Sequence, residues 1–378
     1  MLLFMNIRFY KIIILNFLVI FFSCEKKMDE EIVNYDYLFN KIKSNVSGID
    51  FNNSLKFSED LNIIEYLYFY NGGGVAVGDI NNDGFEDLYL SSNQGKDKLF
   101  INLGDFKFKD ISNSAGLDTL NTWSTGVSMA DVNGDGWLDI HVSKVGNYKT
   151  LKGHNLMYIN QKDGTFNELS EELGIDFSGF STQAAFLDYD NDGDLDMYLL
   201  NHNIHTPRNY TDVSKRSEKD SLSGDKFFEN KINEQEAKFV DVSESSGIFS
   251  SPLGYGLAIT TADINNDGWI DLYVGNDFHE NDYIYINQKN KSFKEKSKDF
   301  LSHNSRFTMG VDIADMNNDK LLDIFTLDMM PFYRDIFLKS GGEDTDQVYK
   351  IKKSFGYEDQ YARNNFHLNR GNSKFTDI

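Results

Sequence analysis

One nine-residue pattern of oxygen-bearing side chains recurs five times in the 378-residue chain. It reads D-x-[ND]-x-D-G-x-x-D and first occurs as DINNDGFED at residues 79–87. Side chains at positions 1, 3 and 5 of a tight loop can point inward in turn. The backbone carbonyl of position 7 adds a neutral oxygen, and the last aspartate can offer both of its oxygens. Six or seven oxygens in a flexible shell suit Ca²⁺, whereas Mg²⁺ requires a stricter octahedron. The pattern therefore predicts up to five calcium sites.

The candidate ligands occupy positions 1, 3, 5, 7 and 9 of each copy, and position 7 contributes its carbonyl oxygen. They are Asp79, Asn81, Asp83, Phe85 and Asp87; Asp131, Asn133, Asp135, Trp137 and Asp139; Asp188, Asp190, Asp192, Asp194 and Asp196; Asp263, Asn265, Asp267, Trp269 and Asp271; and Asp315, Asn317, Asp319, Leu321 and Asp323. The fifth copy departs from the pattern because Lys320 replaces the glycine, which weakens the prediction there. A non-glycine residue at positive φ costs about 1 kcal/mol, and the ammonium group could lie near the ion.

Two other interpretations of the pattern were weighed. An EF-hand needs a bidentate glutamate at position 12 and helices on both sides. Position 12 instead holds leucine, valine or threonine in the five copies, and the flanks read as strands. The second alternative is a set of plain Asn/Asp turns without metal, but such a turn needs one or two of these residues. Four at fixed spacing favour the metal.

The segments around each copy predict the elements that position it. Small and apolar residues such as GGGVAVG precede the motif, and a strand-like run such as LYLSSN follows it. A second aromatic and asparagine pattern, LFINLGDFKFKDIS in the first copy, reads as a hairpin. The motifs start 52, 57, 75 and 52 residues apart, and no long helical period occurs after residue 60. Units of four short strands repeated in this way predict an all-β fold, a β-propeller of four-stranded antiparallel blades.

The same patterns predict the domain organisation. We expect a lipoprotein-type signal peptide at 1–23, a tether at 24–35 and a repeat propeller at 36–378. The expected repeats lie near 71–117, 122–175, 179–248, 253–301 and 305–378. Residues 39–49 and 374–378 both resemble the closing strand of a unit. One ring position cannot take both strands, so we expect about five blades in an incomplete array.

The N-terminus predicts a membrane-directed protein. Arg8 and Lys11 precede the apolar run 12–22, which is too short for the roughly 20 residues that span a bilayer. Cys24, the single cysteine, follows directly and resembles the lipidated cysteine of bacterial lipoproteins, although Phe21 stands where that motif usually has leucine. An uncleaved signal anchor and ordinary secretion remain alternatives. We expect lipidation at Cys24 and an extracytoplasmic location, on the bacterial outer membrane or cell surface.

The stretch GGGVAVGDINNDGFEDLYL resembles the FG-GAP/VCBS repeat, the blade unit of integrin-alpha-type β-propellers. With the lipoprotein-like start, the chain is similar to VCBS-repeat lipoproteins of Bacteroidetes, related to the ASPIC/UnbV and cartilage acidic protein group. In that family the loop lies between strands and binds Ca²⁺. The resemblance, over about 36–378, implies extracellular binding or adhesion without transferable chemistry. Longer relatives continue into further repeats and an ASPIC/UnbV segment.

The sequence therefore predicts a calcium-binding surface lipoprotein that binds a protein or glycan. Its net charge of −22 argues against nucleic acid or anionic lipid as the main partner and suits cation binding. A propeller-type polysaccharide lyase or hydrolase and a truncated, non-functional fragment are the alternatives. His202, His205 and Arg208, in the insertion 201–226, favour a solvated loop over a transition-metal site. Segments 276–283 and 327–337 could line the same face as this insertion, and we expect the apolar residues of the latter to serve packing. None of the common hydrolase, P-loop or dinucleotide motifs occurs.

Overall fold

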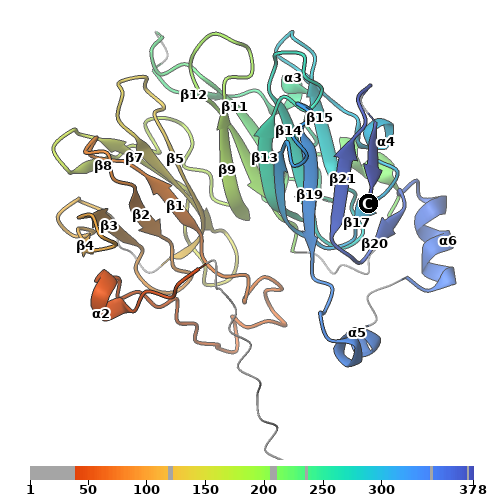
Figure 1. The fold of residues 1–378 in the computed structure, drawn as a ribbon, viewed down its shortest axis with the longest axis horizontal. Helices are drawn as coiled ribbons and strands as arrows, with labels where there is room; N and C mark the ends of the chain where they lie inside the picture. The colour runs from red at the N-terminus through yellow and green to blue at the C-terminus, as the bar shows by residue number, and fades with distance from the viewer. Residues whose placement is uncertain (1–38, 118–121, 205–210, 235–236, 341–343, 373) are drawn as a thin grey trace, which may run out of the picture. The chain divides into compact units, whose positions relative to one another are not determined.

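The computed structural model describes residues 39–117, 122–204, 211–234, 237–340, 344–372 and 374–378 (Figure 1). The expected signal peptide, Cys24 and the tether lie outside the described residues. Ser44–Ile378 forms one compact unit. Among the residues described, no helix has both the length and the apolar composition needed to cross a bilayer.

Five four-stranded antiparallel sheets, here called blades 1 to 5, follow one another along the chain. Blade 1 contains β1 (Val75–Gly78), β2 (Asp87–Leu90), β3 (Lys98–Asn102) and β4 (Phe108–Asp110); blade 2 contains β5 (Trp123–Ala130), β6 (Asp139–Val145), β7 (Leu156–Asn160) and β8 (Phe166–Glu168); blade 3 contains β9 (Ser181–Leu187), β10 (Asp196–Asn201), β11 (Lys226–Asn230) and β12 (Phe239–Asp241); blade 4 contains β13 (Gly256–Ala262), β14 (Asp271–Asn276), β15 (Tyr283–Asn287) and β16 (Phe293–Glu295); blade 5 contains β18 (Thr308–Ala314), β19 (Asp323–Asp328), β21 (Asn365–Asn369) and β22 (Phe375–Asp377). The prediction of an all-β fold built from four-stranded antiparallel blades is confirmed.

Helices are short and lie between the strands. They are α2 (Ser44–Ser47), the 3-10 helix η1 (Val213–Ser217), α3 (Ser243–Ser246), α4 (Ser297–Phe300), α5 (Arg334–Ser340) and α6 (Asp346–Ser354). A two-stranded parallel pair, β17 (Asn304–Ser305) with β20 (Gln360–Tyr361), joins the start of blade 5 to the segment after α6. The expectation that helix is a minor component is therefore confirmed.

Neighbouring blades pack face to face. The first strands make a series of contacts, β1 with β5, β5 with β9, β9 with β13 and β13 with β18. The residue two places after the last motif aspartate faces the next blade in blades 1 to 4, where its side chain has no exposed area. These residues are Tyr89, His141, Tyr198 and Tyr273. The alternation of strand side chains explains why this position is buried in each of the four blades.

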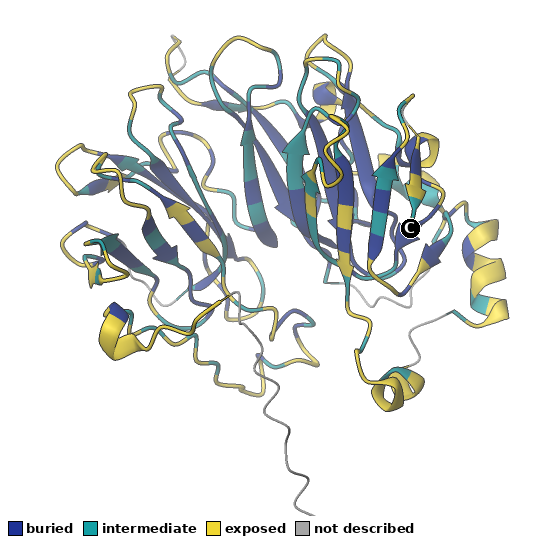
Figure 2. Cartoon of the chain, viewed as in Figure 1, coloured by how far each residue is buried: buried dark blue, intermediate teal, exposed yellow. Residues whose placement is uncertain are grey.

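The series of blades does not close into a ring within the described residues. Phe325 of blade 5, equivalent to Tyr89, is 38% exposed. On the opposite face of blade 1, Val75 is 59% exposed, whereas its equivalent Val127 in blade 2 is buried. Strands β1 and β18 make no extended contact with each other in the part of the chain that the structure describes. The predicted incomplete array is therefore confirmed, and Figure 2 shows the exposed residues on the terminal blades.

The strand expected at 39–49 is wrong, whereas the strand expected near the C-terminus is present as β22. Residues 39–43 have no regular structure, and α2 follows. After α2, Gly48 has φ of 76°, and a Cβ there would lie 2.5 Å from the Phe108 carbonyl oxygen of β4. Gly247 approaches the Phe293 carbonyl of blade 4 in the same way. Residues 44–49 therefore correspond to the connector that packs on the next blade, not to a blade's closing strand.

Residues 55–69 form a hydrophobic cluster with blades 2 and 4 and with the residues that lead into blades 3 and 4. Tyr66 and Phe69 are almost fully buried and pack with Trp123, Phe180 and Tyr255. Because these partners come from the starts of different blades, this segment ties the blades together. Its sequence shows no strand or helix period, which explains why sequence analysis assigned it no role.

We expect Gly247→Ala to destabilise the protein by about 2–4 kcal/mol, because it combines backbone strain with a clash against a carbonyl group. A Cβ at Gly247 would lie 2.7 Å from the Phe293 oxygen. Gly164→Ala is the matched control, since Gly164 also has positive φ but open space around it, and should cost only about 1 kcal/mol. Urea unfolding of both variants measures the difference. Equal losses would contradict the tight connector contact.

Candidate metal centre

Each motif forms the turn between the first two strands of its blade, and the same hydrogen bonds shape all five turns. The first aspartate accepts backbone N–H groups from positions 5 and 6. In blade 1, the N–H of Asp83 donates to Oδ1 of Asp79 at 3.1 Å, and that of Gly84 donates to Oδ2 at 2.8 Å. The equivalent acceptors are Asp131, Asp188, Asp263 and Asp315. The first aspartate therefore organises the turn itself.

Positions 4 and 6 of every turn have positive φ. Position 6 was expected to need this conformation, and Gly84 has φ of 87°. Lys320 adopts the same conformation at φ of 69°, and its N–H donates to Asp315 at 2.8 Å as a glycine would. The fifth turn therefore has the shape of the other four. Sequence analysis missed position 4, although asparagine or glycine stands there in all five copies. These residues are Asn82, Gly134, Asn191, Asn266 and Asn318.

The last aspartate of each motif begins the second strand and is buried. In blade 1, Oδ2 of Asp87 accepts the N–H of Ile80 at 3.1 Å, and Oδ1 accepts the N–H of Asn102 at 2.7 Å. The same pair of bonds holds Asp139, Asp196, Asp271 and Asp323. Both oxygens therefore already bind the backbone. A cation would use their remaining lone pairs, so two-oxygen coordination stays a prediction, as does that by the position-7 carbonyl.

Burial raises the pKa of the last motif aspartates of blades 1 to 4 above the usual range. The pKa is about 6 for Asp87, about 7 for Asp139 and Asp271, and about 8 for Asp196. The backbone hydrogen bonds oppose this effect, and the neighbouring motif carboxylates add to it. Ionising these groups is therefore unfavourable unless a cation offsets the charge.

An asparagine at the end of each third strand was not predicted as part of the site. The Asn102 side chain donates to the Glu86 carbonyl, next to the last motif aspartate. In blade 2, Asn160 donates to the Leu138 carbonyl and also to the Ile80 carbonyl of the preceding blade's motif. Asn230, Asn287 and Asn369 bind the equivalent carbonyl of their own blade. The recurring asparagine of LFIN and MYIN was the available signal.

The third turn is the most acidic and fits a cation best. Oxygens of Asp188, Asp190 and Asp196 lie within 4.8 Å of one another. Asp194 has a buried Oδ1 without a hydrogen-bond partner, and its pKa is raised to about 6 by burial and by Asp192. In the fourth turn, Oδ1 of Asn265 is buried and also lacks a partner. Clustered carboxylate and amide oxygens with unused acceptor capacity are suited to a hard cation such as Ca²⁺.

Lysines from the hairpins approach three of the motifs. Lys291 Nζ lies 2.6 Å from Oδ2 of Asp190, and it also pairs with Glu229. Lys162 lies 3.2 Å from Asp135, and Lys289 lies 3.3 Å from Asp267. These ammonium groups offset part of the negative charge. A bound cation would compete with them for the same oxygens.

His202 is a core residue rather than a metal ligand. It is almost fully buried, and its Nε2 lies 2.9 Å from the Tyr66 hydroxyl, while Nδ1 lies 3.1 Å from Thr182. Burial lowers its pKa to about 3. The solvated loop expected there is therefore wrong for His202, whereas His205 and Arg208 lie outside the described residues.

The insertion at 201–226 and segment 276–283 do come together. Arg216 of η1 donates to Glu280 at 2.8 Å and to Asn281 at 2.8 Å. Residues after α6 join them, because the Glu358 N–H donates to Asn281 at 3.3 Å. Segment 327–337 belongs to the corresponding connection of blade 5, between β19 and β21, so it lies at the same end of the blades. The packing role expected for its apolar residues is wrong, since Phe332 is 93% exposed.

Comparison with known proteins decides the nature of the repeat. A family model for the FG-GAP-like repeat matches residues 79–142, 146–199 and 263–326. The chain carries FG-GAP-like repeats. It is 29% identical over 209 residues to cartilage acidic protein 1 of Xenopus tropicalis. The aligned region covers 54% of this chain and 29% of that protein. The chain is 37% identical over 81 residues to integrin alpha-3 of Cricetulus griseus, which covers 18% and 8%. The chain spans less than a third of these relatives' length.

Two solved structures resemble the FG-GAP-like array. An Agrocybe aegerita lectin, solved to explain its recognition of non-reducing terminal N-acetylglucosamine, aligns with 80% of this chain and 64% of its own, at a TM-score of 0.43 and 14% identity. The V. cholerae biofilm matrix protein Bap1 aligns with 68% and 34%, at a TM-score of 0.34 and 13% identity. Likeness at this level says nothing about the ligand of this chain.

In chelator, we expect the melting temperature to fall as pH rises from about 5 to 8. The folded-state pKa values of Asp87, Asp139, Asp196 and Asp271 lie between about 6 and 8, above that of an unfolded aspartate. The folded state therefore binds more protons, and the stability that protonation provides is lost as pH rises through these values. Saturating Ca²⁺ should remove the decline. A decline that calcium leaves unchanged in a differential scanning measurement would contradict cation binding here.

We expect Lys291→Met to raise calcium affinity at the third turn, because the ammonium group competes with the ion for Asp190. Lys291 is about half exposed, so the gain should be modest, about 1 kcal/mol or roughly fivefold. Lys219→Met is the control, since Lys219 pairs with Glu244 away from the motifs. Calcium titration of the melting temperature compares the two. An unchanged or lower affinity in Lys291→Met would show that this pair does not compete with the ion.

Proposed function

We propose that this chain is a calcium-stabilised, lipid-anchored binding protein of an extracytoplasmic surface, with a protein or glycan as ligand. The FG-GAP-like repeats and the homology to integrin alpha and cartilage acidic protein 1 support an adhesion-type or binding role. The observation that carries the calcium part is the repetition of one hydrogen-bonded turn five times, with clustered carboxylates in the third. The apolar run before Cys24 supports the anchor.

Calcium has a structural role in this proposal. The carboxylates of Asp188, Asp190 and Asp196 cluster in the third turn, and the net charge of the chain is −22. A divalent ion in each turn offsets the repulsion within it and stiffens the connection between the first two strands. Because the asparagines of the third strands link adjacent motifs, binding in one blade also supports its neighbour.

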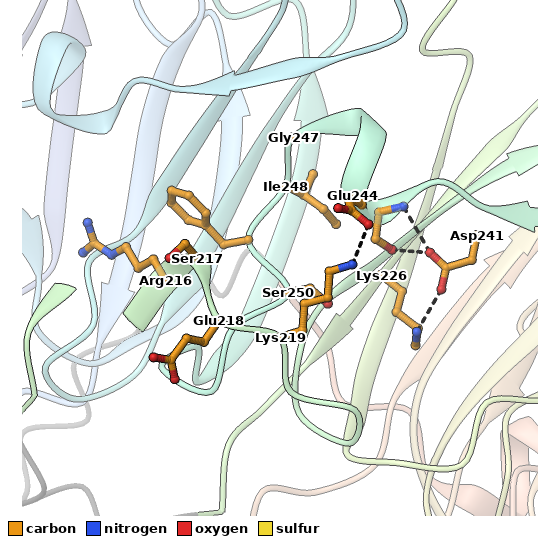
Figure 3. A pocket seen from close by; sticks show the side chains of 12 residues that line it. Arg216, Ser217, Glu218, Lys219, Lys226, Asp241, Glu244, Gly247, Ile248 and Ser250 are labelled. Atoms are coloured by element: carbon orange, nitrogen blue, oxygen red, sulfur yellow. Dashed lines mark hydrogen bonds and ion pairs between the residues drawn. The ribbon is translucent and has the colours of Figure 1, made fainter. Parts of the chain in front are cut away.

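The charged groups of a pocket beside η1 give the enzyme alternative less support than the binding role. This pocket has a volume of about 520 Å³ and lies between η1, the end of blade 3 and α3 (Figure 3). Three carboxylates line it. Asp241 pairs with Lys226 at 2.9 Å, Glu244 pairs with Lys219 at 2.7 Å, and Glu218 pairs with Lys215. A glycosidase-type acid needs a raised pKa.

The pKa values of Asp241 and Glu244 are lowered instead of raised. Burial opposes the shift at Asp241, but hydrogen bonds from Ser243 and Lys226 outweigh it and lower the pKa. The hydrogen bond from Lys219 lowers the pKa of Glu244. Neither carboxyl group is suited to donate a proton at neutral pH. This favours binding over hydrolysis at the pocket.

We expect Asp83→Ala to weaken calcium binding at the first turn more than Asn81→Ala does, because it removes a charged ligand rather than a neutral one. Binding in the range of extracellular calcium modules, roughly 10⁻⁴–10⁻³ M, is expected for the unmodified turns. Calcium titration by calorimetry measures both variants. Equal effects, or no heat of binding in the unmodified protein, would contradict the proposed ligand set.

Glycan-array and pull-down experiments test the binding part of the proposal, each with calcium and with chelator. We expect a specific protein or glycan to be retained, and to be lost in chelator if the turns must be ordered for recognition. Turnover of a polysaccharide by the purified chain would instead support the lyase or hydrolase alternative. A chain that melts at the same temperature with and without calcium would remove the structural role of the ion.

A further inference from the structure

The two ends of the blades differ in chemistry. In an antiparallel meander, the motif turn and the hairpin between the third and fourth strands lie at one end, here called the motif end. The connection between the second and third strands lies at the other, here called the far end. α5 lies in the far-end connection of blade 5. The segment 53–65 also lies at the far end, because Asn53 binds Asn93 and the Tyr148 hydroxyl donates to the Glu65 carbonyl. The acidic motifs and these two segments are therefore on opposite ends.

The far end exposes an unusual amount of apolar surface. Around α5, six large apolar or aromatic side chains are between 47% and 93% exposed. They are Met329, Met330, Phe332, Tyr333, Ile336 and Leu338. In and after the N-terminal segment, Phe57 is 80%, Ile64 is 89% and Tyr70 is 64% exposed. Soluble monomers rarely expose so many large apolar side chains together unless they serve an interaction.

The α5 segment (Met329–Ser340) projects rather than forming a groove. Figure 1 shows α5 beyond the end of the blade 5 strands, joined to them by extended chain, and Figure 2 shows it largely exposed. A small pocket of about 150 Å³ lies behind it, with Phe337 and Met329 in its lining. A projecting apolar helix is suited to entering a soft apolar layer, whereas a concave site would be suited to holding a ligand.

We propose that the far end contacts a lipid bilayer, with the α5 segment and the Ile64 region entering the interface between headgroups and acyl chains. The charges of the α5 segment suit this position, because Arg334 and Lys339 outnumber Asp335 and can reach the headgroups. The acidic motif end then faces away from the membrane. This inference rests on the lipid anchor of the proposed function, which would hold the chain at the bilayer.

The length of the chain between Cys24 and the compact unit permits this contact. Residue 24 precedes the compact unit at Ser44 by 20 residues, which span at most roughly 70 Å when extended. An anchored unit therefore stays near the membrane, where even weak apolar contacts set its orientation. The bilayer orients the array so that its motif turns face away from the membrane and its terminal blades stay accessible to solvent.

Site-specific fluorescence tests the proposal in the lipidated protein. Phe332→Cys and Ile64→Cys each introduce one thiol for an environment-sensitive nitrobenzoxadiazole probe, since lipidated Cys24 would not react. Leu103→Cys is the matched control, because Leu103 is 61% exposed in the β3–β4 turn at the motif end. The proteins are reconstituted in phosphatidylcholine vesicles with and without lipids that carry a doxyl quencher.

We expect a blue shift and a loss of intensity from the doxyl lipids at residues 332 and 64, and neither effect at residue 103. An aqueous spectrum at 332 in protein that floats with the vesicles would overturn the proposal while leaving the anchor intact. A blue shift that depends on protein concentration and resists the quencher would assign the α5 segment to a protein contact and also overturn it. Flotation of Cys24→Ala tests the anchor separately. If this variant still floats with the vesicles and keeps an intact N-terminus, the segment is a signal anchor.

Discussion

A buried aspartate at the start of each second strand holds the blade together. Asp87 and its four equivalents accept one N–H from the motif turn and one from the third strand. The carboxylate thereby joins the first, second and third strands at a point where the chain reverses direction. Without it, the turn would lose its position relative to the sheet, and the other motif oxygens would no longer converge. The register of every blade depends on this interaction.

The same aspartates explain why the fold and the proposed ion are linked. Burying a carboxylate is unfavourable when it is charged, and the raised pKa values of these groups reflect that cost. Lys291 at Asp190 and Lys162 at Asp135 offset part of the charge from outside. A divalent ion would do so from within the turn. The motif therefore joins the strands of the blade, and it is also the place where a bound cation would stabilise the blade.

The chain has two kinds of exposed apolar surface. The terminal blades expose faces that are buried between blades elsewhere, as the contrast between Phe325 and Tyr89 illustrates. The far end exposes a different surface, which belongs to the α5 segment and to the chain before blade 1 rather than to the sheets. The pocket beside η1 is lined by paired charges, so its chemistry is that of a polar recognition surface more than of a proton-transfer site.

Local sequence patterns predict the repeated unit, its four strands and the candidate ligands. These features are local, because a period of two and fixed oxygen spacing are visible within a dozen residues. The sequence also contains the asparagine or glycine at position 4 of each motif and the asparagine that ends each third strand. The roles of these residues became visible only in the folded backbone. The folded structure was needed to show which distant residues pack against a given side chain. It placed His202 against Tyr66, made residues 44–49 a connector instead of a strand, and left Phe332 exposed instead of packed. Each of these outcomes depends on segments far apart in the sequence, and local pattern contains no information about which of them meet.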